Sequence, residues 1–126
     1  MQGYEQEGRK KGSQEGEEMV QEIKLKMWTV QEVEARREAE PGLLLLDVRT
    51  EGEWNAYHIP GATLLPMQAM TSRLEELDPH RETIVLCEHG MRSMRVARFL
   101  VEQAGFENVG NMLGGMSAWE GPVEGG

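Results

Sequence analysis

The sequence predicts a three-layer α/β/α fold around a central, mostly parallel five-stranded sheet. Residues 43–48 and 82–87 are apolar runs without polar alternation, which is typical of strands that are covered on both faces. Segments with helical periodicity separate the expected strands, and such alternation generally produces a parallel sheet with helices on both faces. The chain of 126 residues has the length of one domain, and it can bury a core without disulfides or metals.

The domain is expected to begin with a strand over 23–27, where apolar and charged residues alternate. Thr29 and Glu32 have the spacing of a capping box, so a helix is expected to begin there. Pro41 and the glycine that follows it end this helix. The buried strand over 43–48 comes next.

Several short elements are expected between the two buried strands. Residues 59–62 have the composition of a turn, and 63–66 are expected to form a short strand. Residues 67–77 are expected to form a helix. The second buried strand, over 82–87, ends at Cys87.

The last part of the chain is expected to form a helix over 92–106, a strand over 108–113, and a tight turn with a short helix over 114–121. Gly105 lies where a glycine commonly ends a helix. An apolar stripe along this helix is expected to pack on the sheet. The stripe consists of Met94, Ala97, Leu100, Val101 and Ala104.

Composition limits the class of protein. The net charge of −9 argues against nucleic-acid binding, which is expected to need a basic face. No apolar run approaches the roughly 18 residues of a membrane span, so no membrane partner is expected. The single cysteine fits a reducing, cytoplasmic compartment. Residues 1–18 are expected to form a flexible, acidic and glycine-rich tail before a domain over 19–126.

Cys87 ends a predicted strand, and a short polar loop joins it to the next helix. Backbone N–H groups in such a loop, with the positive end of the helix, stabilise an anion and lower the pKa of a thiol. Gly90 permits a tight turn, and Arg92 adds a planar cation with bidentate donors. These features indicate a reactive thiolate, whereas an inert buried cysteine is the alternative. Cys87 and His89 alone do not make a metal site, so neither a metal nor a cofactor is expected.

Four motifs occur along the chain, namely LLLLDVRTEGEW, HIPGA, CEHGMRS and LGGMSAW. In this order they resemble the pattern of the single-domain rhodaneses, a family of sulfurtransferases whose active loop reads Cys-x-x-Gly-x-Arg-Ser. The resemblance covers about residues 23–121 and implies a rhodanese-like fold. Tyr57 departs from the pattern, because glycine usually precedes the HIPGA turn.

The resemblance implies a thiosulfate sulfurtransferase-type enzyme with Cys87 as its catalytic residue. Cys87 takes the outer sulfur of a donor such as thiosulfate, carries it as a persulfide, and passes it to cyanide or a thiol. A sulfur-accepting protein is an alternative acceptor, and the enzyme is expected to be a monomer or a homodimer. His89 either steers the donor or faces solvent. The residues expected to bind the donor are Glu88, His89, Gly90, Met91 and Arg92.

Asp47, Arg49 and Glu53 are expected to support the loop. Asp47 and Arg49 follow a buried strand, where an internal ion pair is the expected role. Arg92 either binds the sulfonate end of the donor or pairs with an acid such as Glu53 or Asp47. Glu88 is unexpected, because a carboxylate opposes an anionic donor. It either points into solvent or signals a donor other than thiosulfate.

Two other functions are alternatives. Related phosphatases and arsenate reductases need five residues between cysteine and arginine, because a tetrahedral oxyanion must fit inside the loop. Here four residues separate Cys87 from Arg92, and this smaller ring suits a persulfide sulfur. A non-catalytic rhodanese-like interaction module is the second alternative, which the retained cysteine, glycine and arginine disfavour.

Overall fold

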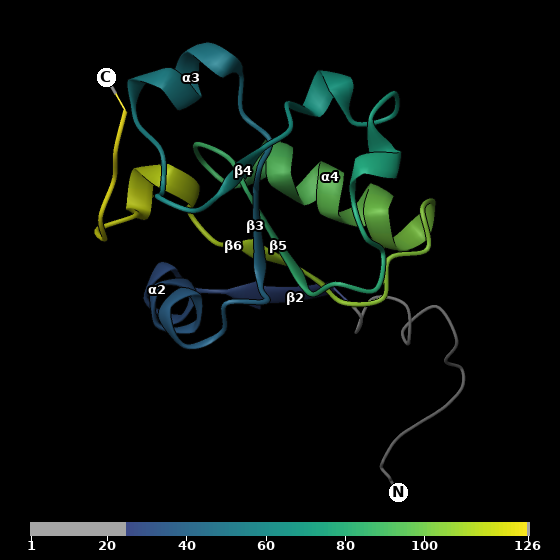
Figure 1. The fold of residues 1–126 in the computed structure, drawn as a ribbon, viewed down its shortest axis with the longest axis horizontal. Helices are drawn as coiled ribbons and strands as arrows, with labels where there is room; N and C mark the ends of the chain where they lie inside the picture. Colours follow the sequence, from purple (N-terminus) through teal and green to yellow (C-terminus); the bar gives the residue numbers. More distant parts are fainter. Residues whose placement is uncertain (1–24, 126) are drawn as a thin grey trace, which may run out of the picture.

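The computed structural model describes residues 25–125, in which five strands form one sheet (Figure 1). The strands are β2 (Leu25–Trp28), β3 (Leu44–Asp47), β4 (Thr63–Leu64), β5 (Thr83–Leu86) and β6 (Val109–Met112). Their order is β2-β6-β5-β3-β4, and every neighbouring pair is parallel. The predicted five-stranded α/β fold is therefore confirmed. The tail predicted for residues 1–18 lies outside the described residues, as does the predicted start of the first strand.

Helices connect the strands within the same part of the chain. The α-helices are α2 (Val30–Ala39), α3 (Glu51–Ala56) and α4 (Met91–Glu102). The shorter 3-10 helices are η1 (Met67–Ala69), η2 (Leu74–Glu76) and η3 (Gly115–Ala118). The short helix expected near the C-terminus is thus present as η3.

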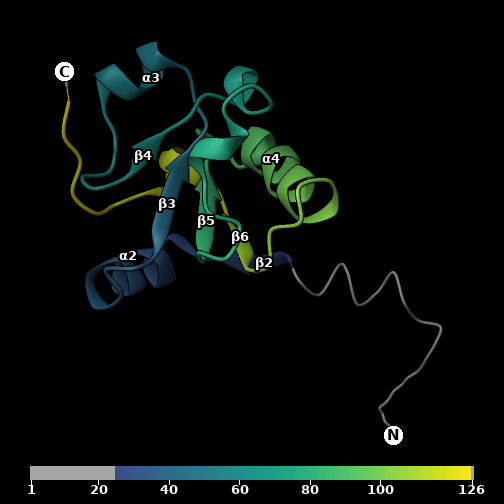
Figure 2. The same cartoon turned by 45° about the vertical axis from the view of Figure 1, so that its right-hand side comes forward.

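Two apolar cores cover the two faces of the sheet. Leu44 and Leu46 of β3 belong to the core beneath α4, whereas Leu45 belongs to the core beneath α2. Figure 2 shows α4 on one side of the strands and α2 on the other. Because neighbouring residues of a strand point to opposite faces, a strand covered on both faces needs apolar residues at every position. The predicted three-layer arrangement is confirmed.

The signals expected at helix ends are present. The Thr29 hydroxyl accepts the N–H of Glu32 at 3.1 Å, and the Glu32 carboxylate accepts the N–H of Thr29 at 2.8 Å, so α2 begins with a capping box. Gly105 follows α4 with a φ of 76°, and the N–H of Phe106 donates to the carbonyl of Leu100 at 2.9 Å. The predicted stripe of α4 is largely confirmed, since Ala97 and Leu100 are buried and Val101 and Ala104 pack against the same core. Ser93 and Val96 are buried in addition, whereas Met94 is only partly buried.

The prediction of one helix over 67–77 is wrong, because η1 and η2 are separate short turns there. The hydroxyl of Ser72 donates to the carbonyl of Ala69 at 3.2 Å, and such a local bond competes with the regular helical pattern. The apolar residues of this segment still reach the core, with Met70 buried and Leu77 packed at its edge.

The sequence interpretation missed α3. Thr50 and Glu53 repeat the capping-box spacing of Thr29 and Glu32, and both of the expected hydrogen bonds are formed. The helix has six residues, of which none is buried, so it lacks the apolar periodicity that identifies longer helices. The capping box was the available signal.

A glycine in β6 provides a test of the packing. A Cβ atom at Gly110 would lie 2.5 Å from the indole nitrogen of Trp28, whereas one at Gly42 meets nothing within 4 Å. We expect Gly110→Ala to lower the free energy of unfolding by about 1–3 kcal/mol, which is typical of overpacking. The matched variant Gly42→Ala should change it by about 1 kcal/mol or less. Urea unfolding of both variants measures the difference, and equal stabilities would contradict this packing.

Candidate active site

The carboxyl ends of β3 and β5 meet at one edge of the sheet, where Asp47 pairs with Leu86. Cys87 follows at once, and the loop after it leads into α4, a helix of 12 residues. Cys87 is 1% exposed, and its Sγ accepts the N–H groups of Gly90 at 3.1 Å and Ser93 at 3.2 Å. The sulfur therefore lies at a helix N-terminus among backbone donors.

Opposing effects act on the pKa of the Cys87 thiol. Burial raises this pKa, because the thiolate loses solvation. Hydrogen bonds from the Ser93 side chain and from the backbone of Ser93, Gly90 and His89 lower it, and together they outweigh burial. The pKa lies below the ordinary value for cysteine, which increases the thiolate fraction at neutral pH.

The hydroxyl of Ser93 links the sulfur to a buried amide. Its Oγ lies 3.3 Å from the Sγ of Cys87, and the hydroxyl donates to the Oδ1 of Asn111 at 2.6 Å. A hydroxyl both accepts and donates, so Ser93 can accept from the neutral thiol and can turn its hydrogen toward the thiolate. The sequence interpretation missed both residues. The available signals were the serine that ends CEHGMRS and a polar residue within a buried strand.

The C-terminal glycine turn fixes the backbone of the loop. The N–H groups of Met116 and Ser117 donate to the carbonyls of Cys87 and Glu88 at 2.8 and 2.9 Å. Gly115, with a φ of 63°, makes this approach possible, because a Cβ there would lie 2.3 Å from the Cys87 carbonyl oxygen. With these carbonyls bound on the outside, the loop's N–H groups are free to point at the sulfur.

Asp47 and Arg49 form the expected internal ion pair beside this loop. Both side chains are 0% exposed, and the guanidinium donates to both carboxylate oxygens of Asp47 at 2.9–3.2 Å. Arg49 also donates to the carbonyl of Tyr57 at 2.7 Å and to Glu88 at 3.2 Å. One buried cation thus holds the end of β3, the residue after α3, and the active loop.

Two hydrogen-bond donors hold the Glu88 carboxylate beside the loop. Tyr57 donates its hydroxyl hydrogen to Oε2 of Glu88 at 2.7 Å, and Arg49 donates to Oε1 at 3.2 Å. The bond to Glu88 raises the pKa of Tyr57 above its ordinary value. The Glu88 side chain remains 22% exposed, so it reaches solvent in part while both of its oxygens have donors. Tyr57, the residue that departs from the family pattern, was not predicted to contact the loop.

Arg92 pairs with Glu53, one of the two acids considered for it. The guanidinium donates to both carboxylate oxygens at 2.8 and 2.9 Å. The hydrogen bond from Arg92, helped by the one from the Thr50 backbone, outweighs burial and holds the pKa of Glu53 at about 2, well below the ordinary value. The short helix α3 thus carries the acid that fixes the first turn of α4. Two other residues predicted to bind the donor, His89 and Met91, are exposed, and Met91 is 76% exposed.

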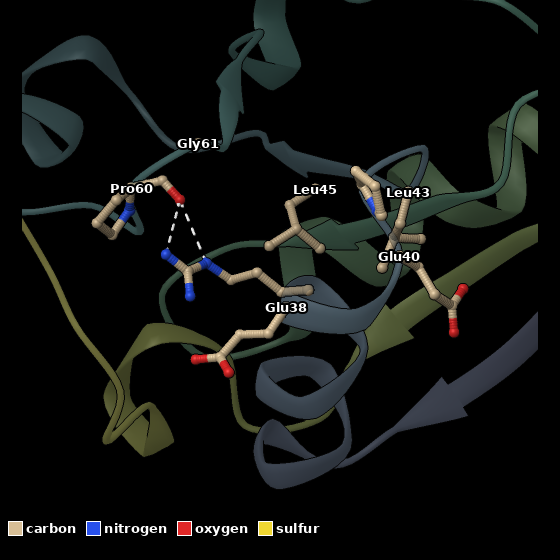
Figure 3. A pocket seen from close by; sticks show the side chains of 8 residues that line it. Glu38, Glu40, Leu43, Leu45, Pro60 and Gly61 are labelled. Carbon is tan, nitrogen blue, oxygen red and sulfur yellow. Dashed lines mark hydrogen bonds between the residues drawn. The ribbon is translucent and has the colours of Figure 1, made fainter.

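A cavity of about 440 Å³ lies elsewhere on the molecule (Figure 3). It is formed between α2 and the turn at Pro60, whose carbonyl accepts two bonds from the Arg37 guanidinium at 3.3 Å. Leu45 in its lining belongs to the core beneath α2, whereas Cys87 belongs to the core beneath α4. This cavity is therefore separate from the candidate site.

Residues 25–125 contain no cluster of three or more histidine, cysteine, aspartate or glutamate side chains that could hold a metal ion. In the same range, no helix has the length and apolar character needed to cross a membrane.

A thiol at the start of an anion-binding loop, on the rim of a parallel sheet, is typical of α/β proteins that use a reactive cysteine. The family model for the rhodanese-like domain matches residues 29–122, so this chain belongs to that family. It is 42% identical over 87 residues to YtwF of Bacillus subtilis, covering 69% of this chain and 82% of that protein. It is 38% identical over 78 residues to the thiosulfate sulfurtransferase GlpE of Pseudoalteromonas translucida, covering 62% and 73%. The crystal structure of a rhodanese-like domain protein from Staphylococcus aureus aligns with a TM-score of 0.72 and 28% identity, covering 80% and 98%.

The hydrogen bonds to the sulfur can be tested through its reactivity. Ser93→Ala removes the hydroxyl whose hydrogen can turn from Asn111 to the thiolate, and a hydrogen bond to a charged group contributes about 1.5–3 kcal/mol. We expect alkylation of Cys87 by iodoacetamide at pH 7 to slow about tenfold, with the pH profile of the rate moving to higher pH. Ser72→Ala, which removes an exposed hydroxyl, is the control. An unchanged pH profile in Ser93→Ala would show that the hydroxyl does not stabilise the thiolate.

The ion pair between Glu53 and Arg92 predicts a pH dependence of stability. Since folding lowers the pKa of Glu53 to about 2, its stabilisation is complete above its unfolded pKa of about 4.5 and is lost as the pH falls toward about 2. Both side chains are about one-third exposed, at 31% and 32%, so screening limits the contribution to about 1 kcal/mol. Urea unfolding should show a deficit for Glu53→Gln at pH 7 that shrinks below about pH 4.5. Glu51→Gln in the same helical turn is the control, and a deficit independent of pH would contradict the assignment.

Proposed function

We propose that this protein is a sulfurtransferase that carries a sulfane sulfur as a persulfide on Cys87. The observation that supports this most strongly is the set of N–H donors around Sγ at the start of α4. A persulfide is an anion, and preorganised backbone dipoles stabilise an anion without reorganising during the reaction. The GlpE relative is named a thiosulfate sulfurtransferase, which supports the same chemistry.

The reaction has two halves. The thiolate of Cys87 attacks the outer sulfur of a donor such as thiosulfate, a new S–S bond forms, and the old one breaks so that sulfite leaves with its electron pair. A thiolate or cyanide acceptor then attacks the outer sulfur of the persulfide, and Cys87 leaves as the thiolate. The chain has one cysteine, so no internal disulfide can discharge the persulfide. The sulfur therefore passes to an external acceptor.

The residues of the loop have distinct proposed roles. The backbone of Glu88 to Arg92 forms the anion-binding ring, and its four residues between Cys87 and Arg92 make it too small for the tetrahedral oxyanion of a phosphatase. Asp47, Arg49 and Glu53 support the loop from outside. Because Glu53 engages Arg92 through both carboxylate oxygens, we assign Arg92 mainly to holding the loop.

Intact mass spectrometry tests the persulfide. Incubation of the full chain with thiosulfate, a thiosulfonate or glutathione persulfide should add one sulfur, about 32 Da, to the wild-type protein. Cys87→Ser should show no addition and no transfer of sulfur from thiosulfate to cyanide. If none of these donors adds mass to the wild-type protein, the sulfurtransferase assignment is overturned. Cys87-dependent hydrolysis of a phosphate ester would point to the phosphatase alternative.

The loop residues predict an order of activities. Arg92→Ala frees the first turn of α4 from Glu53, and small displacements of a reacting group cost large factors in rate. We expect kcat/KM for sulfur transfer to fall about tenfold or more, whereas His89→Ala, at an exposed position, changes it about threefold or less. Steady-state assays with cyanide as the acceptor measure both. The reverse order would assign the functional role in the loop to His89.

A further inference from the structure

The two unexpected residues of the sequence contact each other beside the loop that begins at Cys87. Tyr57 stands where the family pattern usually has glycine, and Glu88 places an acid directly after Cys87. The structure joins them through the 2.7 Å hydrogen bond from the Tyr57 hydroxyl. Arg49 holds the second carboxylate oxygen, so both oxygens of Glu88 have donors. The Glu88 side chain is 22% exposed, so its charge is fixed but still open to the solution from which a donor arrives.

Negative charges outnumber positive charges around the loop. Arg49 is shared between Asp47 and Glu88, so one cation faces two carboxylates. Arg92 is engaged by Glu53 through both of its carboxylate oxygens. Two guanidinium groups therefore face three carboxylates, and the thiolate of Cys87 adds a further negative charge.

Other positive side chains near the loop do not reverse this excess. Arg98, on the exposed face of α4, forms an ion pair with Glu102. Arg95 is exposed on the same helix and forms no ion pair with any described residue, and His89 is exposed in the loop. The loop can still receive a donor, because the backbone N–H groups attract the reacting sulfur. Glu88 is the residue next to Cys87 and is partly exposed, so it repels each additional negative charge on that donor.

We propose that Glu88, fixed by Tyr57 and Arg49, is a specificity-determining residue that selects organic sulfane-sulfur donors with a single negative charge over the thiosulfate dianion. This inference rests on the proposed function and narrows its donor. Organic thiosulfonates and organic persulfides belong to the favoured class. In each case the bond from the outer sulfur to its neighbour breaks, and the leaving sulfinate or thiolate carries away the electron pair. The persulfide formed on Cys87 is the same as with thiosulfate.

Two sulfur donors that differ in charge but deliver the same kind of sulfur test the role of the Glu88 charge. Thiosulfate carries two negative charges and benzenethiosulfonate carries one, and both deliver a sulfane sulfur from a sulfonyl group. At the distances and effective dielectric of a protein surface, one unit charge changes the encounter with another by about three- to tenfold. Removal of the Glu88 charge should therefore help thiosulfate more than benzenethiosulfonate.

Glu88→Gln is the central variant, because glutamine can accept from Arg49 and donate to the oxygen of Tyr57 while it carries no charge. We expect kcat/KM to rise about tenfold for thiosulfate and about threefold for benzenethiosulfonate. Both gains should shrink at high salt, because ions screen exposed charges. Glu102→Gln removes the same charge at the other end of α4, roughly 16 Å along the helix, and should leave the ratio of the two donors unchanged.

Tyr57 is a positioning residue in this proposal, and a double-mutant cycle tests it. Tyr57→Phe removes the hydroxyl that fixes Glu88, so it should lower the preference for benzenethiosulfonate over thiosulfate. In the Glu88→Gln background the same change should leave that preference unaltered, because its partner charge is already gone. A general structural role for Tyr57 would change both backgrounds equally and would contradict the proposal.

The outcomes for the donor and for the proposed function are distinguishable. If neither probe nor glutathione persulfide adds sulfur to the wild-type protein, the proposed function fails. If glutathione persulfide alone adds sulfur, the sulfurtransferase function stands and the preference for benzenethiosulfonate over thiosulfate is wrong. If both probes load Cys87 and Glu88→Gln raises kcat/KM equally for the two, the sulfurtransferase function stands and the role of Glu88 in selecting the donor is wrong. A larger gain for thiosulfate that disappears at high salt supports the proposal.

Discussion

The guanidinium of Arg49 holds three separate segments at the rim of the sheet, and its position explains much of the site. It is fully buried, and it binds Asp47 at the end of β3, the carbonyl of Tyr57 after α3, and Glu88 in the active loop. A buried cation without partners is costly, and breaking such a pair typically costs about 3–5 kcal/mol. The three segments are therefore constrained to meet around this one group.

The protein stabilises an anion at Cys87 with backbone dipoles, while carboxylates engage the nearby arginines. Gly90 and Ser93 donate their N–H groups to the sulfur, and the turn around Gly115 binds the carbonyls of the same loop from the other side. Arg49 and Arg92 are paired with acids, so they hold the scaffold in place. In the proposed function this arrangement stabilises a small anionic sulfur inside the loop. We propose that Glu88 adds selectivity among sulfur donors at this loop.

Several features could be predicted because they depend on local sequence. The unbroken apolar runs ending at Asp47 and Cys87 identified two central strands, and the Thr29 capping box identified the start of α2. The helix expected over 67–77 was wrong because its apolar spacing fits two short turns as well as one helix, and a side-chain bond from Ser72 favours the turns. Helix α3 was missed because none of its residues is buried.

The sequence by itself determined the layered parallel fold, because the apolar patterns of the strands and helices predict it. It also identified Cys87 as the candidate nucleophile, because a short loop with a glycine joins the strand that ends there to the next helix. The sequence also limited the expected partners of Arg92 to the sulfonate end of the donor or an acid such as Glu53 or Asp47. Only the tertiary structure decided which partner was used, because Glu53 reaches Arg92 from a helix 39 residues away along the chain. The same holds for Tyr57 and Glu88, which lie 31 residues apart. No local rule relates such distant residues, and their contact follows from the way the sheet brings its carboxyl ends to one edge.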